Sequence, residues 1–114
     1  MKMFKEVILK GQNHGRRYSI DIRWTIDKRP KPVILFLHGF KGFKDWGTFP
    51  LIAEKLSDEG FVVVKMNFSH NGVTVDDPGN FNDLDAFAEN RFSYELDDVK
   101  DTIDFICSSH FPVP

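Results

Sequence analysis

The residues best suited to chemistry follow a short apolar run in the first third of the chain. Residues 32–37 read Pro-Val-Ile-Leu-Phe-Leu, and the chain then passes through His38, Gly39 and Phe40 to Gly42. Glycine lets a backbone turn sharply and approach a ligand without a Cβ in the way. A loop of this kind can aim a backbone N–H at a carbonyl oxygen that gains negative charge during acyl transfer. The simpler interpretation is that Gly39 and Gly42 only shape a turn.

Ser69 and His70 are a second pair of residue types that suggests catalysis, since a histidine can activate a serine hydroxyl for nucleophilic attack. Successive residues of an extended chain point to opposite sides, so the two side chains are not expected to meet. No glycine elbow surrounds Ser69 that would strain it into exposure. We therefore do not expect this pair to catalyse a reaction.

The acidic residues between positions 69 and 90 do not predict a metal site. Their spacing fits no EF-hand loop, and scattered carboxylates are usual on a solvated surface. We assign no metal ligand and no cofactor to the chain. The acidic residues concerned are Asp76, Asp77, Asp83, Asp85 and Glu89.

Two aromatic residues and the single cysteine allow structural interpretations. Phe43 and Trp46 either line an acyl pocket or cover the end of a helix, and the sequence leaves both interpretations open. Cys107 follows an apolar helical stripe, so we expect a buried thiol rather than a reactive one.

The elements that must position these residues begin with a β-hairpin. Residues 4–9 predict a short strand and residues 11–15 a turn. A second strand follows in which apolar and polar residues alternate, the pattern of an antiparallel strand with one face on the core. Its apolar positions are Tyr18, Ile20, Ile22, Trp24 and Ile26.

A strand–helix–strand unit comes next. Residues 33–37 and 61–64 are wholly apolar, as in strands that are buried on both faces. Between them, apolar residues recur at helical spacing from Phe49 to Leu56, with Thr48 as a candidate N-cap and Gly60 as a stop. This βαβ order predicts parallel strands joined by a right-handed crossover.

The remaining chain predicts a long loop and a last helix. Residues 69–90 are polar, with turn signals at Asn71-Gly72 and Pro78-Gly79 and a short helical turn near residues 84–87. The helix is predicted by an apolar stripe and an opposite polar face. The stripe is Phe92, Leu96, Val99, Ile103 and Ile106, and the polar face is Asp97, Asp98, Lys100, Asp101 and Asp104.

Composition limits the class of protein. At 114 residues the chain is one domain or part of one, and a net charge of −2 gives no basic footprint for nucleic acid. Lys28, Arg29 and Lys31 predict only a solvated basic loop. One cysteine excludes an intrachain disulfide and fits a reducing compartment, and neither a secretory leader nor a membrane span is visible. We expect a cytoplasmic protein with no nucleic-acid or membrane partner.

The order of elements and motifs resembles the N-terminal portion of an α/β-hydrolase. The segments 39–47 and 61–72 are most similar to the dienelactone-hydrolase and acyl-peptidase-like branch of that family. The resemblance implies an α/β fold with an incomplete α/β-hydrolase sheet: an antiparallel N-terminal hairpin, a parallel βαβ unit and a further helix. Residues 1–114 would then form the N-terminal part of a single α/β-hydrolase domain.

The resemblance also implies roles for individual residues. The backbone N–H of Phe40 would be one oxyanion donor, as in the loop after the third strand of this fold. Gly39, Phe43, Trp46 and His70 would border the site for a small acyl or ester substrate. His38 would pack and hydrogen-bond in support of the loop, because the family's catalytic histidine lies near the C-terminus.

The triad that such a hydrolase needs is not found in the sequence. No Gly-x-Ser-x-Gly motif occurs, and no later Asp and His follow in the family's order. We expect the chain to be truncated before the nucleophile elbow and, by itself, inactive. The alternative is a non-catalytic remnant or binding module.

The resemblance also places the predicted strands in an order. It runs from the hairpin to the strand at residues 61–64, then to Val33–Leu37 and then to the family's fifth strand, which is missing here, so that Val33–Leu37 becomes an edge strand. Because a flat apolar edge is a template for pairing, we also expect self-association through Val33–Leu37. Swapping, or docking of a C-terminal half, would cover the same edge, and the remaining alternative is that the chain is a domain fragment.

Overall fold

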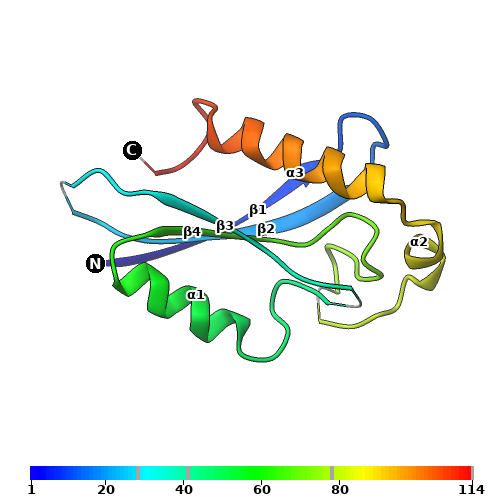
Figure 1. Cartoon of the computed structure of the whole chain (residues 1–114), viewed down its shortest axis with the longest axis horizontal. Coiled ribbons are helices and arrows are strands. Elements are labelled where there is room, and N and C mark those ends of the chain that lie inside the picture. Colours follow the sequence, from blue (N-terminus) through cyan, green and yellow to red (C-terminus); the bar gives the residue numbers. More distant parts are fainter. Residues whose placement is uncertain (28, 41, 78, 114) are drawn as a thin grey trace.

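The computed structural model describes residues 1–27, 29–40, 42–77 and 79–113 (Figure 1). The basic loop predicted around Lys28 and the turn predicted at Pro78 therefore lie partly outside the described residues. The elements follow the predicted order of hairpin, strand, helix, strand and helices. They are β1 (Lys2–Lys10), β2 (Arg17–Thr25), β3 (Val33–Leu37), α1 (Phe49–Asp58), β4 (Val62–Met66), α2 (Leu84–Glu89) and α3 (Phe92–Ile106).

The described strands form one mixed sheet in the order β1-β2-β4-β3. β2 pairs with β1 and β4 in antiparallel orientation, whereas β3 and β4 are parallel. Ile22 lies opposite Lys5 on one side and Val64 on the other, and Val64 lies opposite Leu35. The α/β class, the hairpin and the parallel βαβ unit are thus confirmed, and β3 is an edge strand.

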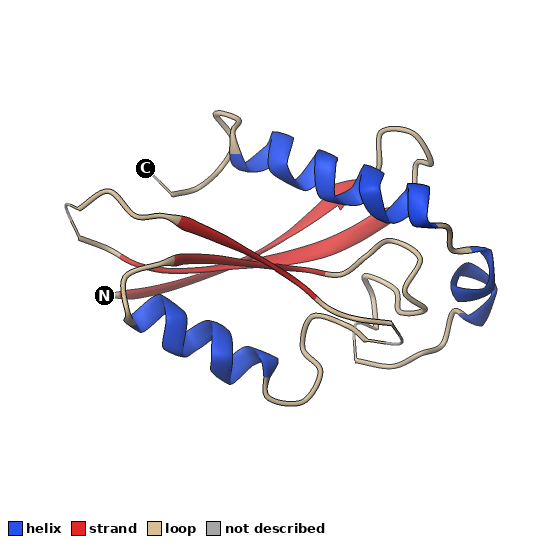
Figure 2. Ribbon diagram, viewed as in Figure 1, coloured by secondary structure: helices blue, strands red, loops and turns tan. Residues whose placement is uncertain are grey.

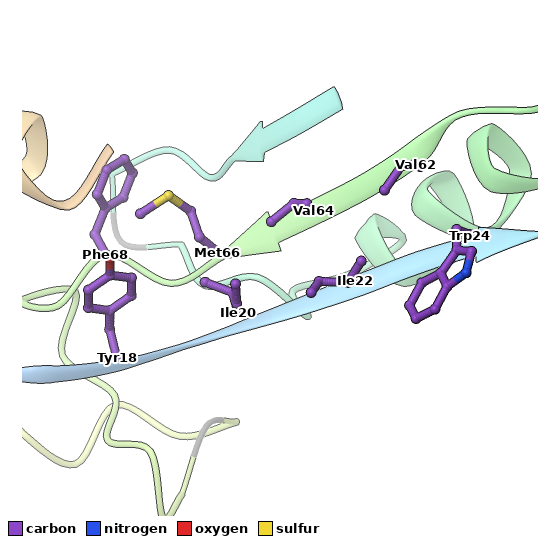
Figure 3. Close-up of a cluster of buried hydrophobic side chains, with 8 residues drawn as sticks. All are labelled: Tyr18, Ile20, Ile22, Trp24, Val62, Val64, Met66 and Phe68. Carbon is purple, nitrogen blue, oxygen red and sulfur yellow. The ribbon is translucent and has the colours of Figure 1, made fainter. Parts of the chain in front are cut away.

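The helices lie on opposite faces of the sheet, α1 on one and α3 on the other (Figures 1 and 2). The apolar core lies on the α3 face, because alternate residues of β2 and β4 point there together. Val99 and Phe105 of α3 pack against this core. Figure 3 shows its central side chains: Tyr18, Ile20, Ile22, Trp24, Val62, Val64, Met66 and Phe68.

The other face of β2 is polar and nevertheless buried. Asp21 is 0% exposed, and its carboxylate lies 3.1 Å from Nζ of Lys44 and 3.3 Å from Nζ of Lys65. Lys65 is also fully buried and binds Asp45 at 2.6 Å. These four residues form the buried ion cluster. It fixes Lys44 and Asp45, which lie in the loop between β3 and α1, onto β2 and β4.

The packing of α3 corrects the predicted helix faces. Asp98, which the sequence placed on the solvated face, is 0% exposed, as is Thr102. Phe92 and Leu96, which the sequence placed on the buried stripe, are 73% and 55% exposed. In this orientation the Asp98 carboxylate binds His14 and Ser69, while Val99 and Ile106 of the stripe still pack against the core.

Two smaller findings complete the fold. Cys107 is exposed, so the predicted buried thiol is wrong: it lies at the C-cap of α3, directly after Ile106, which packs against the core. Within the described ranges, no helix combines the length and apolar character that crossing a membrane requires.

We predict that Asp21→Ala destabilises the fold by about 3–5 kcal/mol, because it removes the fully buried carboxylate between Lys44 and Lys65 and leaves their two ammonium groups with only Asp45 as a shared carboxylate. Urea unfolding followed by circular dichroism measures the change. Asp58→Ala is the matched control, since Asp58 pairs with Lys2 on the surface and an exposed pair contributes at most about 1 kcal/mol. Equal effects of the two substitutions would contradict the role of the cluster.

Candidate functional site

The loop after β3 turns at its two predicted glycines. The N–H of Gly42 donates to the carbonyl of Gly39 at 2.9 Å, which closes a tight turn. A Cβ at Gly42 would lie 2.9 Å from that carbonyl oxygen, so the turn itself requires glycine there. A Cβ at Gly39 would meet no atom within 4 Å, so this position is open to an approaching group. The ring of Phe40 between them is 86% exposed.

His38 supports this loop through hydrogen bonds to the backbone. Its ring is buried, and Nε2 accepts the backbone N–H of Phe68 at 3.1 Å. The proton must then be on Nδ1, which lies 2.9 Å from the carbonyl of Gly39 and donates to it. Both ring nitrogens bind backbone groups, so neutral His38 links β3 to the chain that follows β4, in agreement with the structural role predicted for it.

Two asparagines complete the support: Asn67, which no sequence pattern indicated, and Asn71, which was predicted only as part of a turn. Asn67 accepts the backbone N–H of Lys44 at 2.7 Å, and Asn71 donates to the carbonyl of Gly42 at 3.3 Å. Nζ of Lys65 donates to the carbonyl of Lys44 at 2.8 Å. The loop is therefore held by β4 and by the residues that follow it.

Aromatic rings gather beside the loop. Phe40 lies 5.6 Å from Phe87, Phe87 lies 6.4 Å from Phe81, and Phe81 lies 5.8 Å from Phe43, all between ring centroids. Trp46 instead packs on Phe49 at the start of α1, 5.5 Å away. Of the two interpretations of this pair, Trp46 covers the helix end and Phe43 joins the aromatic cluster.

His70 belongs to a different group of side chains, on the α3 side of the sheet. Its ring stacks on Tyr94 at 4.5 Å and its Nδ1 lies 2.8 Å from Oγ of Ser69. The prediction that Ser69 and His70 do not meet is wrong, because the chain turns after β4 instead of continuing extended. Asp98 and His14 complete this group, which we call the buried His–Ser–Asp cluster.

The proton positions in this cluster follow from its hydrogen bonds. Nδ1 of His14 accepts the backbone N–H of Arg16, so Nε2 carries the proton and donates to Asp98 at 2.7 Å. Ser69 donates its hydroxyl to Asp98 at 2.7 Å and so accepts from His70. Asp98 accepts the backbone N–H of Ser69 as well.

This arrangement does not activate Ser69. A nucleophilic serine gives its proton to a neutral histidine nitrogen and stands exposed to substrate. Here Ser69 as a residue is 2% exposed, and its hydroxyl proton is directed to the Asp98 carboxylate. Ser69, His14 and Asp98 hold the turn after β4 against α3 and the β1–β2 hairpin.

Burial lowers the pKa of both supporting histidines. For His38 burial is the main cause, and the hydrogen bond to Gly39 only partly opposes it. For His70 burial again comes first, and the nearby positive charge of Arg16 lowers the pKa further. Both rings are therefore neutral in the folded protein at neutral pH.

The two cavities beside β3 are not lined by the predicted site residues. A groove of about 280 Å³ runs between Leu37 and α3, and its lining includes His38 and Phe68. A larger cavity of about 450 Å³ lies at the opposite end of the sheet, beside Val33 and Trp24. Neither lining contains Phe40, Phe43 or His70. Over the described ranges, no group of three or more His, Cys, Asp or Glu side chains is arranged to hold a metal ion.

The order of the strands and the helices on both faces define a mixed α/β fold. The loop after its parallel edge strand, β3, is held by hydrogen bonds from buried side chains. No family model and no curated protein matches the chain. Among solved structures, the fold is similar to that of the hypothetical protein PA2218 from Pseudomonas aeruginosa, with a TM-score of 0.64 and 14% sequence identity. The match covers 97% of this chain and 32% of that one. Such a likeness shows the fold alone, and this chain spans about a third of the length of that protein.

We predict that the free energy of unfolding falls as the pH drops below the ordinary histidine pKa of 6.5. The unfolded chain takes up protons there, whereas the folded chain, with lowered pKa values, does not. Each such group contributes a slope of at most about 1.4 kcal/mol per pH unit, until its folded pKa is reached.

Urea unfolding at a series of pH values measures this slope. His38→Phe is expected to reduce it, because the titrating ring is removed. His110→Gln, at an exposed position after α3, is expected to leave it unchanged. A slope in His38→Phe equal to that of the wild type would show that His38 does not titrate as argued.

Proposed function

We propose that this chain is the N-terminal part of a serine hydrolase that acts on esters or related acyl bonds. The observation that carries the proposal is the bracing of the loop after β3. Buried groups hold its backbone at Gly39, Gly42 and Lys44. A loop fixed in this way can offer a backbone N–H without reorganisation, which is what oxyanion stabilisation requires.

In this proposal the donor is the backbone N–H of Phe40. The carbonyl of an acyl substrate would approach over Gly39, where the absent Cβ leaves open space. Phe43 and the neighbouring Phe81 would border the acyl group with apolar surface. The donor would bind the oxygen more strongly as it gains charge in the tetrahedral intermediate, so the interaction would lower the barrier rather than only bind the substrate.

The nucleophile, the base and the acid would come from residues beyond these 114. Within the chain, Ser69 has its hydroxyl beside a histidine, but it is buried and donates to Asp98. The partial coverage of the structural neighbour is compatible with a longer polypeptide of the same fold.

Two measurements address the proposal separately. First, the 114-residue chain is expected to hydrolyse p-nitrophenyl acetate no faster than buffer. The Ser69→Ala variant is expected to behave identically, since no exposed serine is paired with a base at this position. Release of p-nitrophenolate above the buffer rate that disappears in Ser69→Ala would contradict this expectation.

Second, the gene is sequenced beyond codon 114, where we expect the same reading frame to encode a Gly-x-Ser-x-Gly motif. In the polypeptide that carries this serine, Phe40→Pro removes the proposed donor and is expected to lower kcat about 10²–10³-fold. Phe40→Ala keeps the N–H and is the matched control, with a much smaller effect expected. A stop codon, or equal losses in the two variants, would refute the assignment.

A further inference from the structure

The two edges of the sheet differ in their protection against pairing. β1 is one edge, and it carries charged side chains: the lysines at positions 2, 5 and 10, and Glu6. Charged side chains of this kind discourage the addition of another strand. β3 is the other edge, and its sequence Val-Ile-Leu-Phe-Leu contains no polar residue. Among the described strands, β3 pairs with β4 alone, so its outer backbone groups face away from the sheet.

The exposed part of α3 continues this apolar edge. Phe92 and Leu96 share the groove of about 280 Å³ with Leu37 at the C-terminal end of β3. Ile106, at the other end of the helix, lines the larger cavity with Val33 at the N-terminal end of β3. The helix therefore runs along β3 in the opposite direction. Together β3 and these residues of α3 form the apolar edge surface.

We propose that the apolar edge surface binds a second copy of this chain through antiparallel pairing of β3 with β3. A two-fold axis brings the same edge of two copies together only in antiparallel orientation. With Leu35 at the axis, Val33 of one copy lies opposite Leu37 of its partner. These are the two exposed ends of the strand, 42% and 45% exposed, and each covers the other.

The register keeps equivalent faces together. Leu35 packs against the core on the α3 face, whereas Phe36 contacts Phe49 of α1 on the other face, with ring centroids 4.8 Å apart. Side chains alternate along a strand, so Val33 and Leu37 share the α3 face with Leu35. Both α3 helices then lie on one face of a joined sheet, and Phe92 and Leu96 of each copy cover Val33 of the partner.

The charges at the two ends of β3 are complementary in this orientation. The cavity beside Val33 is lined by Asp27, Arg29 and Lys31. Asp27 pairs with both cations, which leaves one positive charge in excess, and of the two cations Arg29 is the exposed one. The groove beside Leu37 is lined by Glu95. Antiparallel pairing places the cationic end of one copy against Glu95 of the other, so attraction between the copies favours this partner and this orientation.

The inference does not rest on acyl transfer. It uses the outer side of β3 and one stripe of α3, whereas the proposed donor lies in the loop after β3. Either proposal can fail while the other holds.

The test is sedimentation velocity of the 114-residue chain over a range of concentrations. We expect a monomer–dimer equilibrium. Leu37→Lys is expected to raise the dimer dissociation constant by roughly tenfold or more, because it places a charge in the apolar register. Ile8→Lys is the matched control: Ile8 is 52% exposed on the β1 edge, and its substitution is expected to leave the equilibrium unchanged. Circular dichroism checks that each variant is folded.

If Leu37→Lys does not fold, Leu96→Glu on the surface of α3 tests the same contact. The orientation is tested by charge reversal: Arg29→Glu and Glu95→Arg should each weaken the dimer, and the double variant should recover it. A wild-type chain that stays monomeric at its highest soluble concentration would overturn the proposal. So would a dimer that Ile8→Lys dissociates and Leu37→Lys does not, since that result places the contact at β1.

Discussion

The burial of Lys65 is the constraint on which the arrangement of the loops depends. An ammonium group that is 0% exposed must be paired and fully hydrogen-bonded, because an unpaired buried charge costs several kcal/mol. Asp21 of β2, Asp45 and the carbonyl of Lys44 provide those partners. Two of the three come from the loop between β3 and α1. Solvating the lysine internally therefore requires that this loop fold back onto the sheet.

A second polar network works in the same way on the other face. Asp98 of α3 accepts from His14 and from Ser69 and so joins the hairpin turn, the turn after β4 and α3. Both networks meet at the carboxyl end of β4, where Asn67 contacts the first loop and Ser69 the second cluster. That end of the sheet is consequently held by hydrogen bonds from both faces, while the opposite end is held mainly by apolar packing around Trp24.

Sequence patterns predicted the elements well and the buried polar groups poorly. Period-two alternation located β2, and the apolar runs located β3 and β4. Both patterns follow from which side chains of a strand are buried, on one face in β2 and on both faces in the other two. Helical periodicity assigned Asp98 to solvent, because the sequence pattern does not distinguish a carboxylate that has buried partners from a solvated one.

The burial of Asp98 could have been predicted from a second stripe of residues, which lie four or seven positions away from it on α3. Tyr94, Thr102 and Phe105 share that inward face. The partners His14 and Ser69 are distant in sequence, so only the tertiary structure could bring them to it. The contact between Ser69 and His70 was missed for a local reason, because the chain turns where an extended continuation was expected.

The supports of the loop after β3 also explain why its chemistry and the pairing of its strand are separable. His38 is braced by Phe68, Lys44 by Asn67 and Lys65, and Gly42 by Asn71. All these partners lie on the inner side of β3, on β4 or just after it. A strand added to the outer edge would bury Val33 and Leu37 but replace none of these bonds. The position of Gly39 and Phe40 is therefore fixed from within the sheet, whichever polypeptide covers the edge.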